Sequence, residues 1–220
     1  MTRTKTTWPK ASHATWLAAL LLATATAWAA SPDAVDAGWI LSKLARPAPM
    51  HTSFVEVRGS ALLKAPLRIE GEYRRPDADT LVREVRAPYV ETTTIRAGEV
   101  AIARGNKSAR KFSLSRAPEL QGLQASFGAL LADDRALLER YYRIEATGTR
   151  QQWTLTLAPK DAALAAKVRD ITLRGRGAEL RCIETRPVKG DLQRTLLAGA
   201  ARSAAPGADG ATLAQLCRGG

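Results

Sequence analysis

The stretch Leu67–Ile102, LRIEGEYRRPDADTLVREVRAPYVETTTIRAGEVAI, decides the fold of this chain. Within it, Leu67–Arg75 alternates apolar and charged side chains, which predicts a strand with one dry face and one wet face. Residues that cannot extend a central strand interrupt the pattern at Arg75-Pro76-Asp77, Ala87-Pro88 and Ala97-Gly98. The stretch therefore predicts four short strands. Because connections this short cannot make a parallel crossover, we expect the strands to be antiparallel.

Flanking segments extend this sheet and add helices. Apolar spacing of three and four residues predicts a helix that begins at Pro32-Asp33 and runs to about Ala45. The same spacing predicts helices over Glu119–Arg140, divided at Asp133-Asp134 with an Asp capping the second, and a helical turn lies around Asp161–Ala166. Further strands are predicted at Thr52–Arg58, Arg110–Ser115, Tyr141–Thr147, Gln151–Leu157, Val168–Leu173, Ala178–Thr185 and Asp191–Leu197. The result is an α+β fold, with about ten strands in a curved antiparallel sheet and helices covering its concave face.

The two ends of the chain differ in composition from this domain, which we place at residues 30–197. Basic residues at the start, an uncharged run over Ala14–Ala27 and small residues around Ala29 predict a signal peptide over residues 1–29, cleaved near Ala29. A membrane anchor is the alternative, but about fourteen apolar residues are too few to span a bilayer that needs roughly twenty. Residues 198–220 form an Ala/Gly-rich tail, and we expect Ala198–Gly210 to be poorly ordered.

Export changes the meaning of charge and of cysteine. Loss of the signal peptide takes the formal net charge from +12 to +9. For an exported chain, anionic membrane surfaces or an acidic partner fit this charge better than nucleic acid does, although arginines that merely cover wet strand faces would give the same charge. In an oxidising compartment, Cys182 and Cys217 are more often a disulfide than a catalytic or metal site. Such a bond would pin the tail to a strand, and two free thiols are the alternative.

No arrangement of residues predicts catalysis. His51 is the one histidine after the signal peptide, and no Gly-x-Ser-x-Gly elbow or zinc-ligand spacing occurs in the sequence. We therefore expect a binding protein without a metal or a cofactor. A large antiparallel sheet either fills its apolar face with side chains or closes it over an apolar ligand. Aliphatic residues outnumber aromatic ones here, which suits acyl chains, but periodicity alone favours an ordinary packed core over a cavity.

Several segments in succession resemble the periplasmic outer-membrane lipoprotein carrier family, LolA, and its divergent related branch. They are Thr52–Glu56, Gly71 leading into Arg75-Pro76, the turn at Ala97-Gly98, Trp153–Lys160 and Ile171-Thr-Leu. The resemblance implies an unclosed half-barrel whose helix-covered cavity holds the acyl chains of lipoproteins or lipids on the way to the outer membrane. It also implies that Arg75 bonds to the helical lid and holds it shut, whereas the residues alone fit equally well a surface arginine that flanks a turn. The chain departs from the usual carrier in its few aromatic residues after Arg-Pro and in its cysteine pair, so the cargo stays open.

The expected site and partners follow from this resemblance. The partners would be acyl chains, an inner-membrane release complex and an outer-membrane acceptor, with a periplasmic monomer that does not bind nucleic acid. The alternative is a periplasmic lipid-sensing or regulatory protein on the same half-barrel, and a lipid-modifying enzyme is disfavoured because a nucleophile with its base is missing. We expect the cavity to be lined by Phe54, Ile69, Tyr73, Leu81, Phe112, Leu114, Leu123, Phe127, Leu130, Ile144, Trp153 and Leu155.

Overall fold

The computed structural model describes residues 1, 2, 4, 35–58, 66–114 and 134–219. Contacts divide the chain into the units Met1–Ser31 and Pro32–Gly220, and the fold below is that of the second unit. Almost all of the predicted signal peptide and most of the predicted segment Glu119–Arg140 lie outside the described residues. Three of the predicted cavity residues, Leu123, Phe127 and Leu130, also lie outside the described residues.

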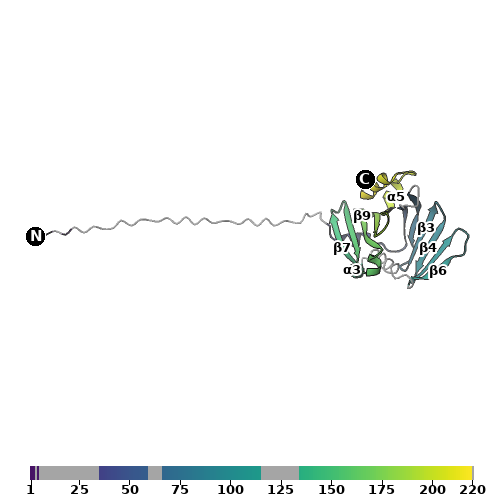
Figure 1. Cartoon of the computed structure of the whole chain (residues 1–220), viewed down its shortest axis with the longest axis horizontal. Helices are drawn as coiled ribbons and strands as arrows, with labels where there is room; N and C mark the ends of the chain where they lie inside the picture. Colours follow the sequence, from purple (N-terminus) through teal and green to yellow (C-terminus); the bar gives the residue numbers. More distant parts are fainter. Residues whose placement is uncertain (3, 5–34, 59–65, 115–133, 220) are drawn as a thin grey trace. The chain divides into compact units, whose positions relative to one another are not determined.

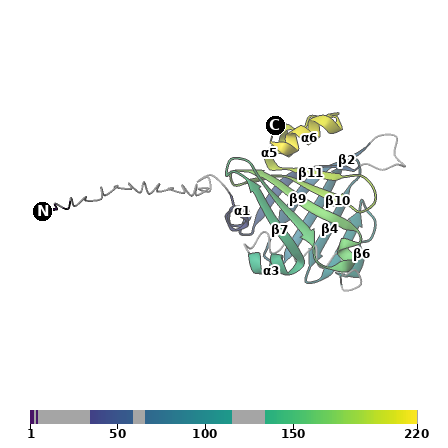
Figure 2. The same cartoon turned by 60° about the vertical axis from the view of Figure 1, so that its left-hand side comes forward.

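Eleven antiparallel strands form one sheet in the order β6-β5-β4-β3-β2-β1-β11-β10-β9-β8-β7. Two meanders, β1–β6 and β7–β11, therefore meet where β1 pairs with β11, at Phe54 opposite Leu197. Figures 1 and 2 show the sheet curving so that the two meanders face each other. The strands are β1 (Met50–Arg58), β2 (Leu67–Arg75), β3 (Thr80–Ala87), β4 (Glu91–Arg96), β5 (Glu99–Arg104), β6 (Arg110–Ser113), β7 (Tyr142–Gly148), β8 (Trp153–Pro159), β9 (Val168–Arg176), β10 (Glu179–Pro187) and β11 (Gln193–Leu197).

These observations confirm the predicted α+β class and the open, curved antiparallel sheet. The described residues form eleven strands, where the sequence predicted about ten. The breaks at Pro76, Pro88 and Gly98 fall between strands, as expected for residues that cannot extend a central ladder. The edge strands β6 and β7 do not pair with each other, which leaves the barrel unclosed.

Helices α1 (Ala37–Leu44), α3 (Arg135–Tyr141) and α4 (Ala162–Ala165) pack against the second meander. Each begins at an aspartate whose carboxylate accepts a backbone N–H: Asp36 caps α1 and Asp134 caps α3. The predicted cap of the second helix is thus confirmed, whereas α1 begins later than predicted. Ile40, Leu41 and Leu138 are fully buried in this core. One half of the concave face is therefore filled by the protein's own side chains.

The carboxyl-terminal segment forms helices, α5 (Ala198–Ser203) and α6 (Gly210–Arg218), where the sequence predicted a poorly ordered tail. Ala200, Ala201 and Ala204 are buried because their small side chains let the backbone approach the sheet closely. A disulfide joins Cys217 of α6 to Cys182 of β10. Alanine richness thus reflects close packing in this segment, and the tail prediction is wrong in that respect.

Helices α5 and α6 lie on the convex face, opposite α1 and α3. They pack with Val55 and Leu196, whereas the strand neighbours Phe54 and Leu197 belong to a cluster on the other face. Successive residues of a strand point to opposite faces, so the two clusters sandwich the junction of β1 and β11. Figure 2 shows α5 and α6 beside β11, away from α1 and α3.

Candidate functional site

A hollow of about 800 Å³ lies on the concave face between the two meanders. Its volume falls within the roughly 300–1,000 Å³ typical of small-molecule sites. Strands β1–β6 supply one wall and β9–β11 the other, and Leu44 of α1 borders it. The apolar side chains that line it include Leu81, Ile95, Val100, Ile102, Phe112, Leu114, Leu173, Leu180, Ile183 and Leu197.

The wall follows from strand alternation and register. Leu81 faces Ile95, Ile95 faces Val100, and Val100 faces Phe112 across four neighbouring strands. Directly paired residues share a face of the sheet, so these four side chains form one apolar row. A second row contains Tyr73 and Thr93, which also line the hollow. Among the described helices, α1 borders this region through Leu44 and α5 through its first residue, Ala198.

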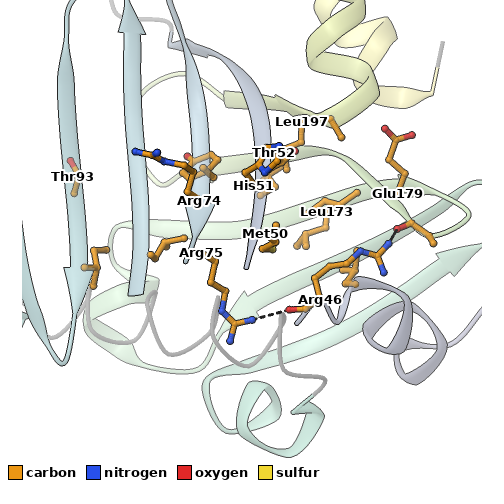
Figure 3. A pocket seen from close by; sticks show the side chains of 18 of the residues that line it. Arg46, Met50, His51, Thr52, Arg74, Arg75, Thr93, Leu173, Glu179 and Leu197 are labelled. Carbon is orange, nitrogen blue, oxygen red and sulfur yellow. Dashed lines mark hydrogen bonds between the residues drawn. The ribbon is translucent and has the colours of Figure 1, made fainter. Parts of the chain in front are cut away.

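Two arginines connect the elements at the opening of the hollow. Arg75, at the end of β2, donates from Nη1 to the carbonyl oxygen of Arg46 at 3.0 Å and from Nη2 to that of Ala78 at 3.2 Å. Arg46 follows α1 and donates from Nη2 to the carbonyl oxygen of Ala178 at 3.0 Å. Figure 3 shows both side chains on the same side of the hollow. The segment after α1 is therefore tied to β2 and to the turn between β9 and β10.

A charged cluster lies on the same face, next to Tyr73. Arg83 donates from Nη2 to Glu56 Oε2 at 2.7 Å, and its Nη1 lies 3.9 Å from Glu91 Oε1. Its guanidinium stacks over the Phe54 ring, 4.9 Å from the centroid. Burial alone would lower the pKa of Arg83, but Tyr73 and Glu56 raise that pKa overall, and burial raises the pKa of the Tyr73 hydroxyl. Arg83 is thus a fixed cation that two buried carboxylates neutralise.

The described lining of the hollow offers few groups that could take part in catalysis. Within the described ranges, no group of three or more His, Cys, Asp or Glu residues could hold a metal ion. Among the described residues, one histidine, His51, and one carboxylate, Glu179, border the hollow. The arrangement can surround an apolar molecule and present cations at the opening.

The sequence model of the family described as outer membrane lipoprotein carrier protein LolA-like matches residues 29–220. The chain belongs to this family. The resemblance found in the strand and turn motifs is thereby confirmed, and the match includes α5 and α6. No curated protein matches the sequence.

Solved structures similar to this LolA-like chain are distant from it. A LolA superfamily protein from Nitrosomonas europaea is 14% identical, with a TM-score of 0.37 over 74% of this chain and 91% of that chain. A chain in the complex of MucA and MucB from Pseudomonas aeruginosa is 17% identical, with a TM-score of 0.39 over 74% and 56%. LprF from Mycobacterium bovis is 14% identical, with a TM-score of 0.33 over 74% and 91%. Among the described residues, no helix has the length and apolar character to cross a membrane.

The structure divides the predicted cavity residues of this LolA-like chain into distinct groups. Tyr73, Leu81, Phe112 and Leu114 line the hollow. Phe54 and Ile69 are buried in a cluster with Val85 and Leu197, next to the hollow but not on its surface. Ile144, Trp153 and Leu155 pack in the filled core beneath α1 and α3. These five residues are corrections: a strand residue that faces the concave side reads alike in sequence whether a helix or empty space lies above it.

Several residues that line the hollow were missed by sequence reasoning. Some of them are apolar residues of β4 and β5, namely Ile95, Val100 and Ile102. Period-two alternation over Glu99–Arg104 could have found the last two. Leu180 and Ile183 of β10 also border the hollow, but a register shift between Leu180 and Cys182 breaks the alternation there. A bulge of this kind has no clear mark in the sequence.

Proposed function

We propose that this LolA-like protein binds the acyl chains of lipoproteins or lipids in the hollow and ferries them through the periplasm towards the outer membrane. The observation that carries the proposal is an apolar space of about 800 Å³ between the two meanders. A packed core would have filled this space, because protein interiors leave few voids larger than a water molecule. Membership of the LolA-like family supports the same reading.

The energetics favour a carrier that opens and closes. Burying a methylene is worth about 0.8 kcal/mol, so a sixteen-carbon chain gains on the order of 12 kcal/mol in a membrane or in the hollow. Unaided transfer through water is therefore slow. A carrier must offer a similar gain and then release the chain to an acceptor. In this proposal an inner-membrane release complex loads the protein, which acts as a monomer, and an outer-membrane acceptor unloads it.

Arg75 is the proposed latch of this movement. Its two hydrogen bonds to carbonyl oxygens join β2 to the segment that follows α1. Bonds from a charged donor contribute about 1.5–3 kcal/mol each, which is enough to bias a helix without fixing it. Arg75→Leu removes both bonds, so it should lower the free energy of unfolding by about 3 kcal/mol, leave the protein folded, and change the rate of acyl transfer between vesicles roughly tenfold.

Arg96→Leu is the matched control, because Arg96 ends β4, is exposed and does not line the hollow. It should transfer acyl chains at the wild-type rate. Equal transfer rates for wild type, Arg75→Leu and Arg96→Leu would remove the latch from the proposal.

Native mass spectrometry of the protein purified from the periplasm tests the cargo directly. We expect a fraction of the protein to carry acylated material. The intact mass should correspond to a chain that begins near residue 30. Protein that carries no acyl chain and takes none up from vesicles loaded with lipoprotein would refute the proposal. Turnover of a lipid ester would indicate an enzyme.

A further inference from the structure

Three arginines that line the hollow have no carboxylate partner in the part of the chain that the structure describes. No ion pair within 4.0 Å among the described residues includes Arg46, Arg75 or Arg176, which we call the rim arginines. Arg46 and Arg176 are exposed and Arg75 is half-buried, so they stand where the hollow opens to solvent. By contrast, Arg174 on the outer face lies 3.0 Å from Glu184.

Glu179, the one described residue at the hollow with a carboxylate, already has partners. Glu179 Oε1 accepts the backbone N–H of Gly199 at 2.6 Å, and Oε2 lies 3.5 Å from Arg181. Arg181 does not line the hollow. Glu179 is therefore neutralised by a neighbour outside the site, and the rim keeps the positive charge of its three arginines.

The rim arginines also keep donors to spare. A guanidinium has five N–H groups. Arg75 and Arg46 use some of them on neutral carbonyl oxygens, and the side chain of Arg176 makes no hydrogen bond to another described residue. Hydrogen bonds between guanidinium and phosphate or carboxylate are shorter and about twice as strong as neutral ones. An anionic group at the opening would therefore find both charge and free donors.

We propose that the hollow selects amphiphiles with an anionic headgroup, phosphate or carboxylate, which the rim arginines bind while the acyl chain enters the apolar space. This inference rests on the proposed function, since it names the class of acyl ligand that the same hollow takes. An apolar wall with cations confined to its opening matches a molecule that is apolar along its chain and negative at one end.

Matched ligands test the inference on the delipidated, full-length protein. Palmitate, palmitoyl lysophosphatidic acid and monopalmitoylglycerol share one tail and differ in the headgroup. Competition against a fluorescent acyl probe should show the two anionic ligands binding at least about tenfold more tightly than the neutral one, a difference of about 1.4 kcal/mol. The preference should shrink as salt shortens the Debye length from about 10 Å at 0.1 M to about 3 Å at 1 M. Comparing the two anionic ligands shows whether carboxylate or phosphate is preferred.

Variants connect the preference to the rim. Arg46→Gln combined with Arg176→Gln should reduce the preference for anionic ligands to about twofold or less without lowering the affinity for the neutral ligand. Lysine at both positions should retain part of the preference. Arg143→Gln combined with Arg169→Gln is the control. Both arginines are exposed and do not line the hollow, and the double substitution removes the same amount of positive charge. If the glutamine pair unfolds, the lysine pair and the salt dependence still decide the question.

The outcomes separate this inference from the proposed function. Equal binding of all three ligands overturns headgroup selection and leaves acyl binding intact, whereas no binding of any ligand overturns both. A preference that persists in the Arg46/Arg176 glutamine pair overturns the assignment to the rim. Inorganic phosphate that competes as strongly as lysophosphatidic acid would show a free-anion site and refute the inference.

Discussion

Filling the hollow from one side should shorten the acyl chain that the protein accepts. Thr93 lines the hollow from β4, and Thr94 points to the opposite face of the same strand. Thr93→Trp places an indole ring in the apolar space, while Thr94→Trp places the same ring outside. If the ring displaces about three methylenes, the cost is about 2.4 kcal/mol at about 0.8 kcal/mol per methylene. Affinity for a long chain should then fall roughly 50-fold.

A series of saturated fatty acids of increasing length measures this effect by calorimetry below micelle formation. For the wild type, each added methylene should raise affinity about fourfold until the hollow is full. Thr93→Trp should follow the same slope and reach its plateau about three methylenes earlier, and Thr94→Trp should match the wild type. Both variants should unfold within a few degrees of the wild type, since an added aromatic ring in open space creates no overpacking.

Two results would refute the reasoning. A wild-type affinity that does not rise with chain length would mean that the chain binds elsewhere. An identical plateau for the two tryptophan variants, with both proteins folded, would mean that the space beside Thr93 does not hold the ligand.

Three further predictions concern stability. Gly175→Ala should destabilise the protein by about 1–3 kcal/mol in urea unfolding, because a Cβ there would overlap the Trp153 ring, and an unchanged midpoint would contradict this packing. Glu184→Gln should cost about 2 kcal/mol at pH 7. Burial alone would raise the pKa of Glu184, but hydrogen bonds from Arg174 and Arg194 lower that pKa overall. The cost should therefore begin to shrink below the unfolded pKa of about 4.3 and be lost as pH falls through the lower pKa of the folded state. Replacing Cys182 and Cys217 by alanine should cost about 4 kcal/mol for a separation of 35 residues, and equal unfolding of oxidised wild type and variant would contradict it.

The glutamate prediction has a matched control on the same sheet. Glu145 on β7 is exposed and has no ion pair among the described residues. Glu145→Gln should leave the free energy of unfolding within about 0.5 kcal/mol of wild type at every pH. A cost at pH 7 that persists unchanged at low pH in Glu184→Gln would refute the role of its charge.

Local signals in the sequence were sufficient to predict the strands. The alternation in Leu67–Arg75 and the breaks at Pro76, Pro88 and Gly98 depend only on neighbours in the chain. The cap at Asp134 is equally local, since its carboxylate reaches the N–H of Leu137 three residues later. Period, turn chemistry and capping therefore give the class and most of the topology.

The division of the concave face could not be predicted, because it depends on which strands lie under which helix. Trp153 belongs to the filled half since β8 pairs with β9 so that Gly175 faces it and leaves room for the ring. Its indole Nε1 donates to the carbonyl oxygen of Gly177 at 2.9 Å. That register is a tertiary property, and the alternation of Trp153, Leu155 and Leu157 reads the same for a core or a cavity.

The hollow can remain open because the sheet is stabilised by contacts that do not use it. On the convex face, Cys182 and Leu196 pack with α5 and α6, and the disulfide adds a covalent link. Beside the hollow, the guanidinium of Arg83 stacks over the Phe54 ring and forms a buried ion pair with Glu56. Loss of the disulfide should therefore lower the free energy of unfolding and leave acyl affinity unchanged. Thr93→Trp should lower acyl affinity and leave the free energy of unfolding unchanged. Such a separation is what a carrier needs, since a ligand whose space also held the fold together could not leave without unfolding it.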